Sequence, residues 1–190
     1  MTGNEGAAWE VHQILAELKV PYAIIGGLAV QNWGEARFTK DVDLTIIIPV
    51  EEQEAILRLL SSHLHPRLPD ALEFARNNRI FLAQTSDETP VDISLGLPGY
   101  EDEMVARAVD YVIKPGKTIR MCSAEDLIIH KLVAGRPQDI RDIEGVIIRQ
   151  ATNLDLHYIR YWLKTFAEWL EGDDVIDRFE QAWRKYAPQS

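Results

Sequence analysis

The stretches YAIIGGLAV, residues 22–30, and RFTKDVDL, residues 37–44, decide the fold of this chain. The first begins with a short apolar run that is typical of a buried strand, and Gly26-Gly27 separates this run from a segment with helical character. The second leads into Val42–Ile48, which is rich in β-branched residues and predicts another strand. The sequence therefore predicts a strand, a glycine turn, a helix and a second strand.

Two carboxylates stand at the start of the second predicted strand. Asp41 and Asp43 are two residues apart, so their side chains project from the same face of a strand and repel each other unless a cation lies between them. Oxygen ligands on a rigid strand suit Mg²⁺, which proteins commonly hold with one or two carboxylates and substrate phosphates. Asp92, in a further predicted strand, is the natural third acid, which would bind a second ion or accept the proton of an attacking hydroxyl.

The pair Gly26-Gly27 has a complementary use. It opens the predicted helix, where unpaired backbone N–H groups and the positive end of the helix dipole favour an anion. Without a Cβ atom, the backbone lets a phosphate approach closely. The sequence contains no GxxxxGK[ST] stretch, so this turn is not a Walker loop. A phosphate-binding turn and a metal-binding acid pair in one strand–helix–strand unit predict nucleoside triphosphate chemistry.

The remaining predicted elements are ordered along the chain, with all predicted strands before residue 122 and only helices after it. This order predicts an α+β fold, with an α/β core over residues 1–122 and a C-terminal helical bundle over residues 123–190. Ser123 is a good N-cap, and Pro137 suits the first turn of a helix. The elements are helices over residues 8–19 and 51–62, an antiparallel strand pair at 79–84 and 91–95, a hairpin at 111–113 and 118–121, and helices over 124–133, 137–149, 159–170 and 176–183.

Composition excludes several classes of protein. The formal net charge is −10, which argues against binding of bulk DNA, because affinity for phosphate comes from basic residues. A single cysteine, Cys122, excludes an internal disulfide framework and a cysteine-based zinc site. No apolar run reaches the roughly 18 residues of a membrane helix, so we expect a cytoplasmic protein without a membrane partner. The modestly basic stretch 58–79 is interpreted as a solvated surface, with a local surface for acceptor RNA as the alternative.

The order Gly-Gly, Asp-x-Asp and an isolated Asp on a later strand resembles the nucleotidyltransferase superfamily with the DNA polymerase β-like fold. Residues 26–44, together with SAEDLIIHKLVAGRPQDIRD at residues 123–142, look more narrowly like the AbiEii-type bacterial nucleotidyltransferases. That group includes toxins of abortive-infection and toxin–antitoxin systems. The resemblance covers residues 8–150 and implies a mixed sheet with flanking helices.

The resemblance also implies roles in the core of the site. Gly26 and Gly27 match the turn that binds the β- and γ-phosphates of the nucleotide. Asp41 and Asp43 match the metal pair, and Asp92 matches the third acid, which serves as a metal ligand and as our candidate base.

Five further residues are assigned more loosely. Lys131 matches a lysine near the nucleotide phosphates, and Asp139 or Asp142 matches an acidic position near the site. Arg37, which would neutralise phosphate charge together with Lys131, and Thr39 precede the acid pair and are also assigned to nucleotide binding. Ordinary helix-surface ion pairs remain the alternative for the acids, and a lysine that extends from an amphipathic helix remains the alternative for Lys131.

The predicted reaction is the transfer of a nucleoside monophosphate from an NTP to a hydroxyl of RNA or protein, with Mg²⁺ or Mn²⁺ as cofactor and an antitoxin or toxin protein as a further partner. Two alternatives stay open. One is modification of a small molecule such as an aminoglycoside, which the acidic charge balance suits. The other is a binding or antitoxin module that uses the same fold without catalysis, although a protein with a purely structural role has no reason to cluster acids.

Overall fold

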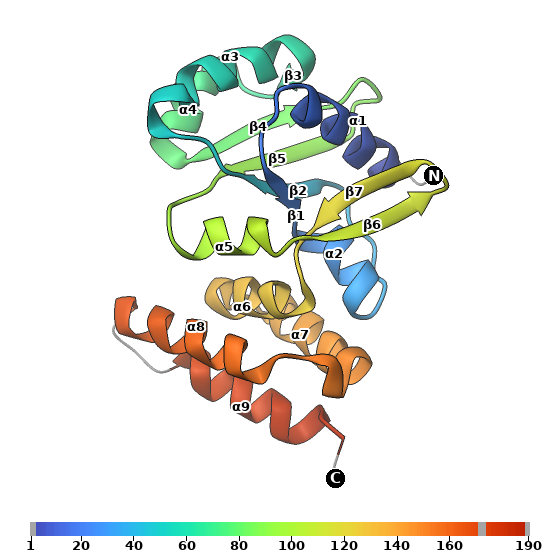
Figure 1. Cartoon of the computed structure of the whole chain (residues 1–190), viewed down its shortest axis with the longest axis vertical. Helices are drawn as coiled ribbons and strands as arrows, with labels where there is room; N and C mark the ends of the chain where they lie inside the picture. Colours follow the sequence, from blue (N-terminus) through green and yellow to red (C-terminus); the bar gives the residue numbers. More distant parts are fainter. Residues whose placement is uncertain (1–2, 171–173, 189–190) are drawn as a thin grey trace. The chain divides into compact units, whose positions relative to one another are not determined.

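Seven strands form one mixed sheet in the described part of the chain, which comprises residues 3–170 and 174–188 of the computed structural model (Figure 1). The strand order is β3-β4-β5-β2-β1-β7-β6. β2 runs parallel to β5 and β1 runs parallel to β7, whereas all other neighbours are antiparallel. The strands are β1 (Tyr22–Ile24), β2 (Val42–Ile46), β3 (His65–Pro66), β4 (Ile80–Gln84), β5 (Pro90–Leu95), β6 (Val109–Lys114) and β7 (Lys117–Met121).

Helices make up most of the rest. The α-helices are α1 (Gly3–Glu17), α2 (Gly26–Trp33), α3 (Gln53–His63), α4 (Ala71–Asn78), α5 (Tyr100–Ala106), α6 (Ala124–Ala134), α7 (Pro137–Gln150), α8 (Leu156–Trp169) and α9 (Asp174–Tyr186). Short 3₁₀ turns, η1 (Val50–Glu52) and η2 (Ala151–Asn153), precede α3 and follow α7. This architecture confirms the predicted α+β fold with a mixed sheet and flanking helices.

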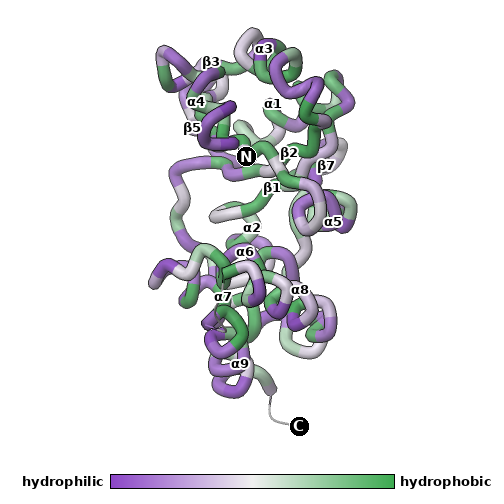
Figure 2. The backbone as a smooth tube through the Cα atoms, turned by 90° about the vertical axis from the view of Figure 1, so that its left-hand side faces the viewer, coloured by the Kyte–Doolittle hydropathy of each residue, from purple (hydrophilic) through white to green (hydrophobic). Residues whose placement is uncertain are grey.

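The chain divides into two compact units, residues 1–28 with 38–122 and residues 29–37 with 123–190. In the first unit, α1 contacts β7 and β2, and α5 contacts β1 and β2. The central strands are apolar, as the hydropathy mapped on the backbone shows (Figure 2). Their buried side chains, including those of Ile24, Leu44 and Ile93, form the core that fixes the sheet.

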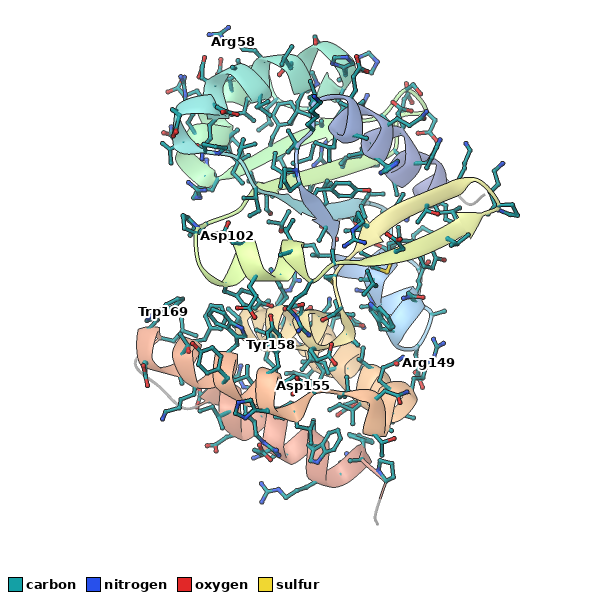
Figure 3. All side chains as sticks on the ribbon, viewed as in Figure 1. Arg58, Asp102, Arg149, Asp155, Tyr158 and Trp169 are labelled. Atoms are coloured by element: carbon teal, nitrogen blue, oxygen red, sulfur yellow. The ribbon has the colours of Figure 1, made fainter. Side chains whose placement is uncertain are left out.

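The second unit is a bundle of α6, α7, α8 and α9 in which α6 packs against the other three helices. Residues 29–37 belong to it, and the end of α7 fixes this segment by hydrogen bonds to its backbone. Arg149, which is labelled in Figure 3, donates to the carbonyl of Gly34, and Gln150 donates to the carbonyl of Trp33. Gly145 allows the close approach, because a Cβ atom there would lie 3.0 Å from the backbone nitrogen of Glu35.

Several local predictions are confirmed. The pair β4–β5 is antiparallel, and β6 and β7 form the predicted hairpin. The side chain of Ser123 caps α6 by accepting a hydrogen bond from the backbone N–H of Asp126, and Pro137 begins α7. Helices α4 and α5 were not predicted, because their eight and seven residues make only about two turns each and show little helical period. In the described part, no helix has the length and apolar character needed to span a membrane.

Candidate active site

The three predicted acids meet at the start of β2, beside β5. Asp43 of β2 is paired in register with Asp92 of β5, and Asp41 lies one residue before β2. The ligand oxygens that these three carboxylates offer all lie within 4.8 Å of one another. Each residue is half-buried, so the cluster is sheltered and still open to a ligand.

The apolar faces of the two strands produce this arrangement. Side chains alternate between faces, so the buried Val42, Leu44 and Ile93 direct their acidic neighbours to the opposite face. A slip of one residue would expose the apolar set, so burial specifies the register strongly. Parallel pairing then places Asp43 beside Asp92, although the two residues are far apart in the sequence.

The glycine turn lies directly against the acids. Gly26 has φ +63°, and a Cβ atom there would lie 2.0 Å from Oδ2 of Asp43. A Cβ atom on Gly27 would lie 2.4 Å from Oγ1 of Thr39. The backbone N–H of Ile25 donates to the carbonyl of Asp43 at 2.9 Å. The predicted phosphate-binding turn and the acidic strand are thus adjacent, with no room between them for a side chain on either glycine.

Thr39 forms a hydrogen bond with Asp41, one of the three acids. Its hydroxyl donates to Oδ1 of Asp41 at 2.9 Å, and its own backbone carbonyl accepts from the side chain of Asn4. The threonine therefore orients one carboxylate of the cluster. Its predicted contact with nucleotide stays a prediction.

Arg67 forms an ion pair with Asp92. Burial raises the pKa of Asp92, the nearby charge of Asp41 raises it further, and Arg67 lowers it, with a net increase over the usual value. In the sequence Arg67 belongs to the basic stretch 58–79, and its contact with Asp92 was not predicted, because no local pattern marks a single arginine after a two-residue strand.

The donor set fits a divalent cation. It consists of carboxylate oxygens only, which are the ligands that Mg²⁺ and Mn²⁺ prefer. Ionised carboxylates this close repel one another, and Arg67 places one positive charge beside Asp92. The cluster therefore has the type of ligand and the concentration of negative charge that suit a divalent cation.

The other arginines of the basic stretch 58–79 are also engaged. Arg58 and Arg76 pair with Glu54, and Arg79 donates to the carbonyls of Leu95 and Gly96 (Arg58 is labelled in Figure 3). Intramolecular partners for these cations support the interpretation of the stretch as ordinary surface rather than an RNA-binding patch.

Lys131 belongs to a buried ion cluster in the second unit. Its Nζ lies 2.8 Å from Oδ1 of Asp139 and 2.8 Å from Oδ2 of Asp142. Arg37 donates two hydrogen bonds to Asp142, at 2.8 and 3.0 Å, and Arg136 pairs with Asp139. Burial by itself would raise the pKa of both acids, but the hydrogen bonds from Lys131 and the arginines outweigh it, so each pKa lies below its usual value.

The structure thus gathers the predicted site residues into two sets. The first unit holds Gly26, Gly27, Thr39, Asp41, Asp43 and Asp92, and the second holds Arg37, Lys131, Asp139 and Asp142. Every residue of the second set forms an ion pair with another residue of that set. The sequence of residues 123–142 alone did not predict these ion pairs.

Replacing Lys131 with Met is expected to reduce the free energy of unfolding by about 3–5 kcal/mol, because two buried carboxylates would lose their shared cation. Urea denaturation measures the change. The control is Lys164→Met at an exposed position of α8, where we expect a change within about 0.5 kcal/mol. A Lys131→Met variant as stable as the wild type would show that the cluster does not depend on the lysine.

His130 should make stability depend on pH. Burial, aided by the charge of Lys131, lowers its pKa from 6.5 to about 4. Between pH 6.5 and pH 4, His130 is therefore protonated in the unfolded chain but neutral in the folded chain. The free energy of unfolding falls as the pH drops through this range, by roughly 3 kcal/mol in total. The depressed pKa values of Asp139 and Asp142 act only below this window.

The check compares urea midpoints of wild type and His130→Asn across this pH range. His12, whose pKa burial also lowers, is present in both proteins, so the difference isolates His130. We expect the gap in stability between the two proteins to change with pH, and a constant gap would contradict the assignment.

Comparison with known proteins agrees with the fold. The structure of an antigenic nucleotidyltransferase-like protein from Paracoccidioides brasiliensis matches with a TM-score of 0.55 and 18% identity, over 98% of this chain and 94% of that one. The antibiotic-resistance factor ANT(2'')-Ia matches with a TM-score of 0.50 and 21% identity, over 86% and 94% of the two chains. At these identities the likeness concerns the fold alone. A comparison with curated proteins finds no match.

The amino-acid sequence matches a known protein family. The profile of a nucleotidyltransferase family of unknown function, DUF6036, matches residues 7–190, which is nearly the whole chain. The superfamily resemblance seen in the glycine turn and the acids is therefore confirmed. The chain belongs to the DUF6036 family of nucleotidyltransferases and is an enzyme of that class.

Proposed function

We propose that the chain transfers a nucleoside monophosphate from an NTP to a hydroxyl acceptor, with Mg²⁺ or Mn²⁺ as cofactor. The observation that carries the proposal is the cluster of Asp41, Asp43 and Asp92, whose ligand oxygens lie within 4.8 Å of one another beside the Gly26-Gly27 turn. In this proposal residues 1–122 form the catalytic core and residues 123–190 the helical region.

Each residue of the core has a role. The backbone of Gly26 and Gly27, at the N-terminus of α2, binds the β- and γ-phosphates, because helix N-termini favour anions. Asp41 and Asp43 hold the divalent ion, and Thr39 keeps the carboxylate of Asp41 oriented. When bound, the ion neutralises phosphate charge and stabilises the leaving oxygen.

Asp92 completes the reaction in this proposal. Besides binding metal, it accepts the proton of the acceptor hydroxyl. The acceptor oxygen then forms a bond to the α-phosphorus, the bond from the α-phosphorus to the bridging oxygen breaks, and pyrophosphate leaves.

Arg37 and Lys131 are proposed to neutralise phosphate charge, with Asp139 and Asp142 orienting them. The support is the resemblance of residues 123–142 to AbiEii-type nucleotidyltransferases and the contacts that join these four side chains. Arg37 is the more accessible of the two cations, with 32% of its side chain exposed against 6% for Lys131.

The AbiEii resemblance also suggests the biological setting. It supports an RNA or protein hydroxyl as the acceptor and a role in a toxin–antitoxin or abortive-infection system, with a partner protein. NTPs and Mg²⁺ are supplied in the cytoplasm, which is where this proposal places the enzyme.

A cationic small molecule is the second candidate acceptor. The net charge of −10 favours a cationic substrate over a polyanion. The engagement of Arg58, Arg76 and Arg79 in contacts within the chain points the same way. An antibiotic-resistance factor with the same fold makes aminoglycosides a reasonable class to test.

The experiment incubates purified protein with Mg²⁺ or Mn²⁺ and each of the four α-labelled NTPs. Total RNA, cell lysate protein and a panel of aminoglycosides serve as separate acceptor pools. Metal-dependent label in one pool supports transfer and identifies the acceptor class. Without label in any pool and without metal-dependent nucleotide binding, the transfer proposal fails, and a binding or antitoxin role on the same fold becomes the better account.

A further inference from the structure

Arg67 reaches the acid cluster from the edge of the sheet. Its backbone N–H donates to the carbonyl of Leu82 at 3.0 Å, and Leu82 is the register partner of Asp92. The row therefore runs from Arg67 through Leu82 to Asp92 and on to Asp43. The backbone contact places the arginine where its side chain can cross one strand and meet Asp92.

The contact occupies a metal-ligand candidate. The guanidinium of Arg67 binds Oδ1 of Asp92, and both side chains are mostly sheltered, with 30% and 27% exposed. A carboxylate shared with a guanidinium attracts a second cation less strongly, since the two positive charges repel each other. Arg67 also relieves the repulsion among the three acids when no ion is bound.

We propose that Arg67 is a positioning residue that acts as the resident counter-cation of Asp92 and so weakens the binding of a free divalent ion to the acid cluster. This inference rests on the proposed function, in which Asp41, Asp43 and Asp92 hold that ion. Its consequence is an ordered reaction: the cluster holds free metal weakly and gains its ion together with the triphosphate, whose oxygens supply further ligands.

The test is a titration of the full chain with Mn²⁺, followed by electron paramagnetic resonance of the free ion, without nucleotide. Arg67→Met is expected to bind Mn²⁺ about tenfold more tightly than the wild type. The reason is that the variant removes the repulsion between the guanidinium charge and the double charge of Mn²⁺ at this partly solvated site. Arg67→Lys keeps the positive charge and should stay close to the wild type. Arg67→Gln, a second neutral variant, should match Arg67→Met.

Two comparisons separate this role from a general effect of charge. Arg58→Met removes an exposed arginine of α3 that pairs with Glu54, and its Mn²⁺ affinity should equal that of the wild type. In an Asp92→Asn background, Arg67→Met should no longer change the affinity. Thermal melts without metal should show that Arg67→Met is less stable than the wild type.

The outcomes distinguish the two proposals. If Asp41→Asn weakens Mn²⁺ binding but neutral variants of Arg67 bind no more tightly than the wild type, the counter-cation role is wrong and the metal site stands. Weaker binding in those variants would instead show that the arginine supports Asp92 as a ligand. If neither the wild type nor any variant binds Mn²⁺ without nucleotide, the counter-cation role is overturned, and the proposed metal site is overturned as well if Mn²⁺ binding is also absent in the presence of an NTP.

Discussion

Replacing Asp41 with Asn, or Asp43 with Asn, is expected to lower the rate of nucleotidyl transfer by about a thousandfold or more. Either change removes one negative charge and one anionic ligand from a cluster whose oxygens lie within 4.8 Å of one another. Binding of the divalent ion is worth several kcal/mol of transition-state stabilisation, and about 4 kcal/mol corresponds to a thousandfold change in rate. Initial rates of pyrophosphate release at saturating NTP and Mg²⁺ measure the effect.

The same substitutions should leave the fold intact. Asn has nearly the shape of Asp, and loss of one charge relieves repulsion among the acids, so the metal-free melting temperature should not fall. Asp177→Asn, on the exposed side of α9, is the matched control and should keep the wild-type rate. Full activity in Asp41→Asn would contradict the assignment of this acid.

Gly26→Ala is the second substitution with a large expected effect. The added Cβ atom would lie 2.0 Å from Oδ2 of Asp43, and the residue would keep an unfavourable φ of +63°. The carboxylate must move, and a displacement of about 1 Å at a reacting centre can cost a hundredfold in rate. We therefore expect transfer activity to fall by about a hundredfold or more, with stability reduced by about 1–2 kcal/mol.

Gly116→Ala separates backbone strain from the clash. Gly116 lies in the turn between β6 and β7 with φ +80°, and a Cβ atom there meets nothing within 4 Å. This variant should show a similar loss of stability in urea denaturation while it retains wild-type activity. Equal activities in the two variants would show that the contact between Gly26 and Asp43 does not matter for the reaction.

The sequence was sufficient for the fold because its strongest patterns are local and consistent. The β-branched run that begins at Val42 and the apolar residues around Asp92 have the period of strands, and only one register buries both apolar sets. The glycine pair next to a strand indicated a turn with a special backbone, and Gly26 has the left-handed conformation.

Local sequence patterns could not predict contacts between residues that are far apart in the chain. The ion pair between Arg67 and Asp92 depends on the two-residue strand β3, which is too short to have a period. The two acids that hold Lys131 lie on α7, and helical spacing allowed them to be surface residues as readily as buried ones. Burial and charge pairing of this kind depend on how helices and strands pack, and no local sequence pattern predicts that packing.

Parallel reactions with α-labelled and γ-labelled NTP, in the presence of Mg²⁺ and the acceptor pool that takes label, test the central claim most directly. If the chain transfers a nucleoside monophosphate, the α-label moves to the acceptor while the γ-label appears in pyrophosphate, and Asp41→Asn slows both by about a thousandfold or more. Movement of the γ-label to the acceptor, or release of inorganic phosphate without labelled acceptor, would contradict nucleotidyl transfer at this site.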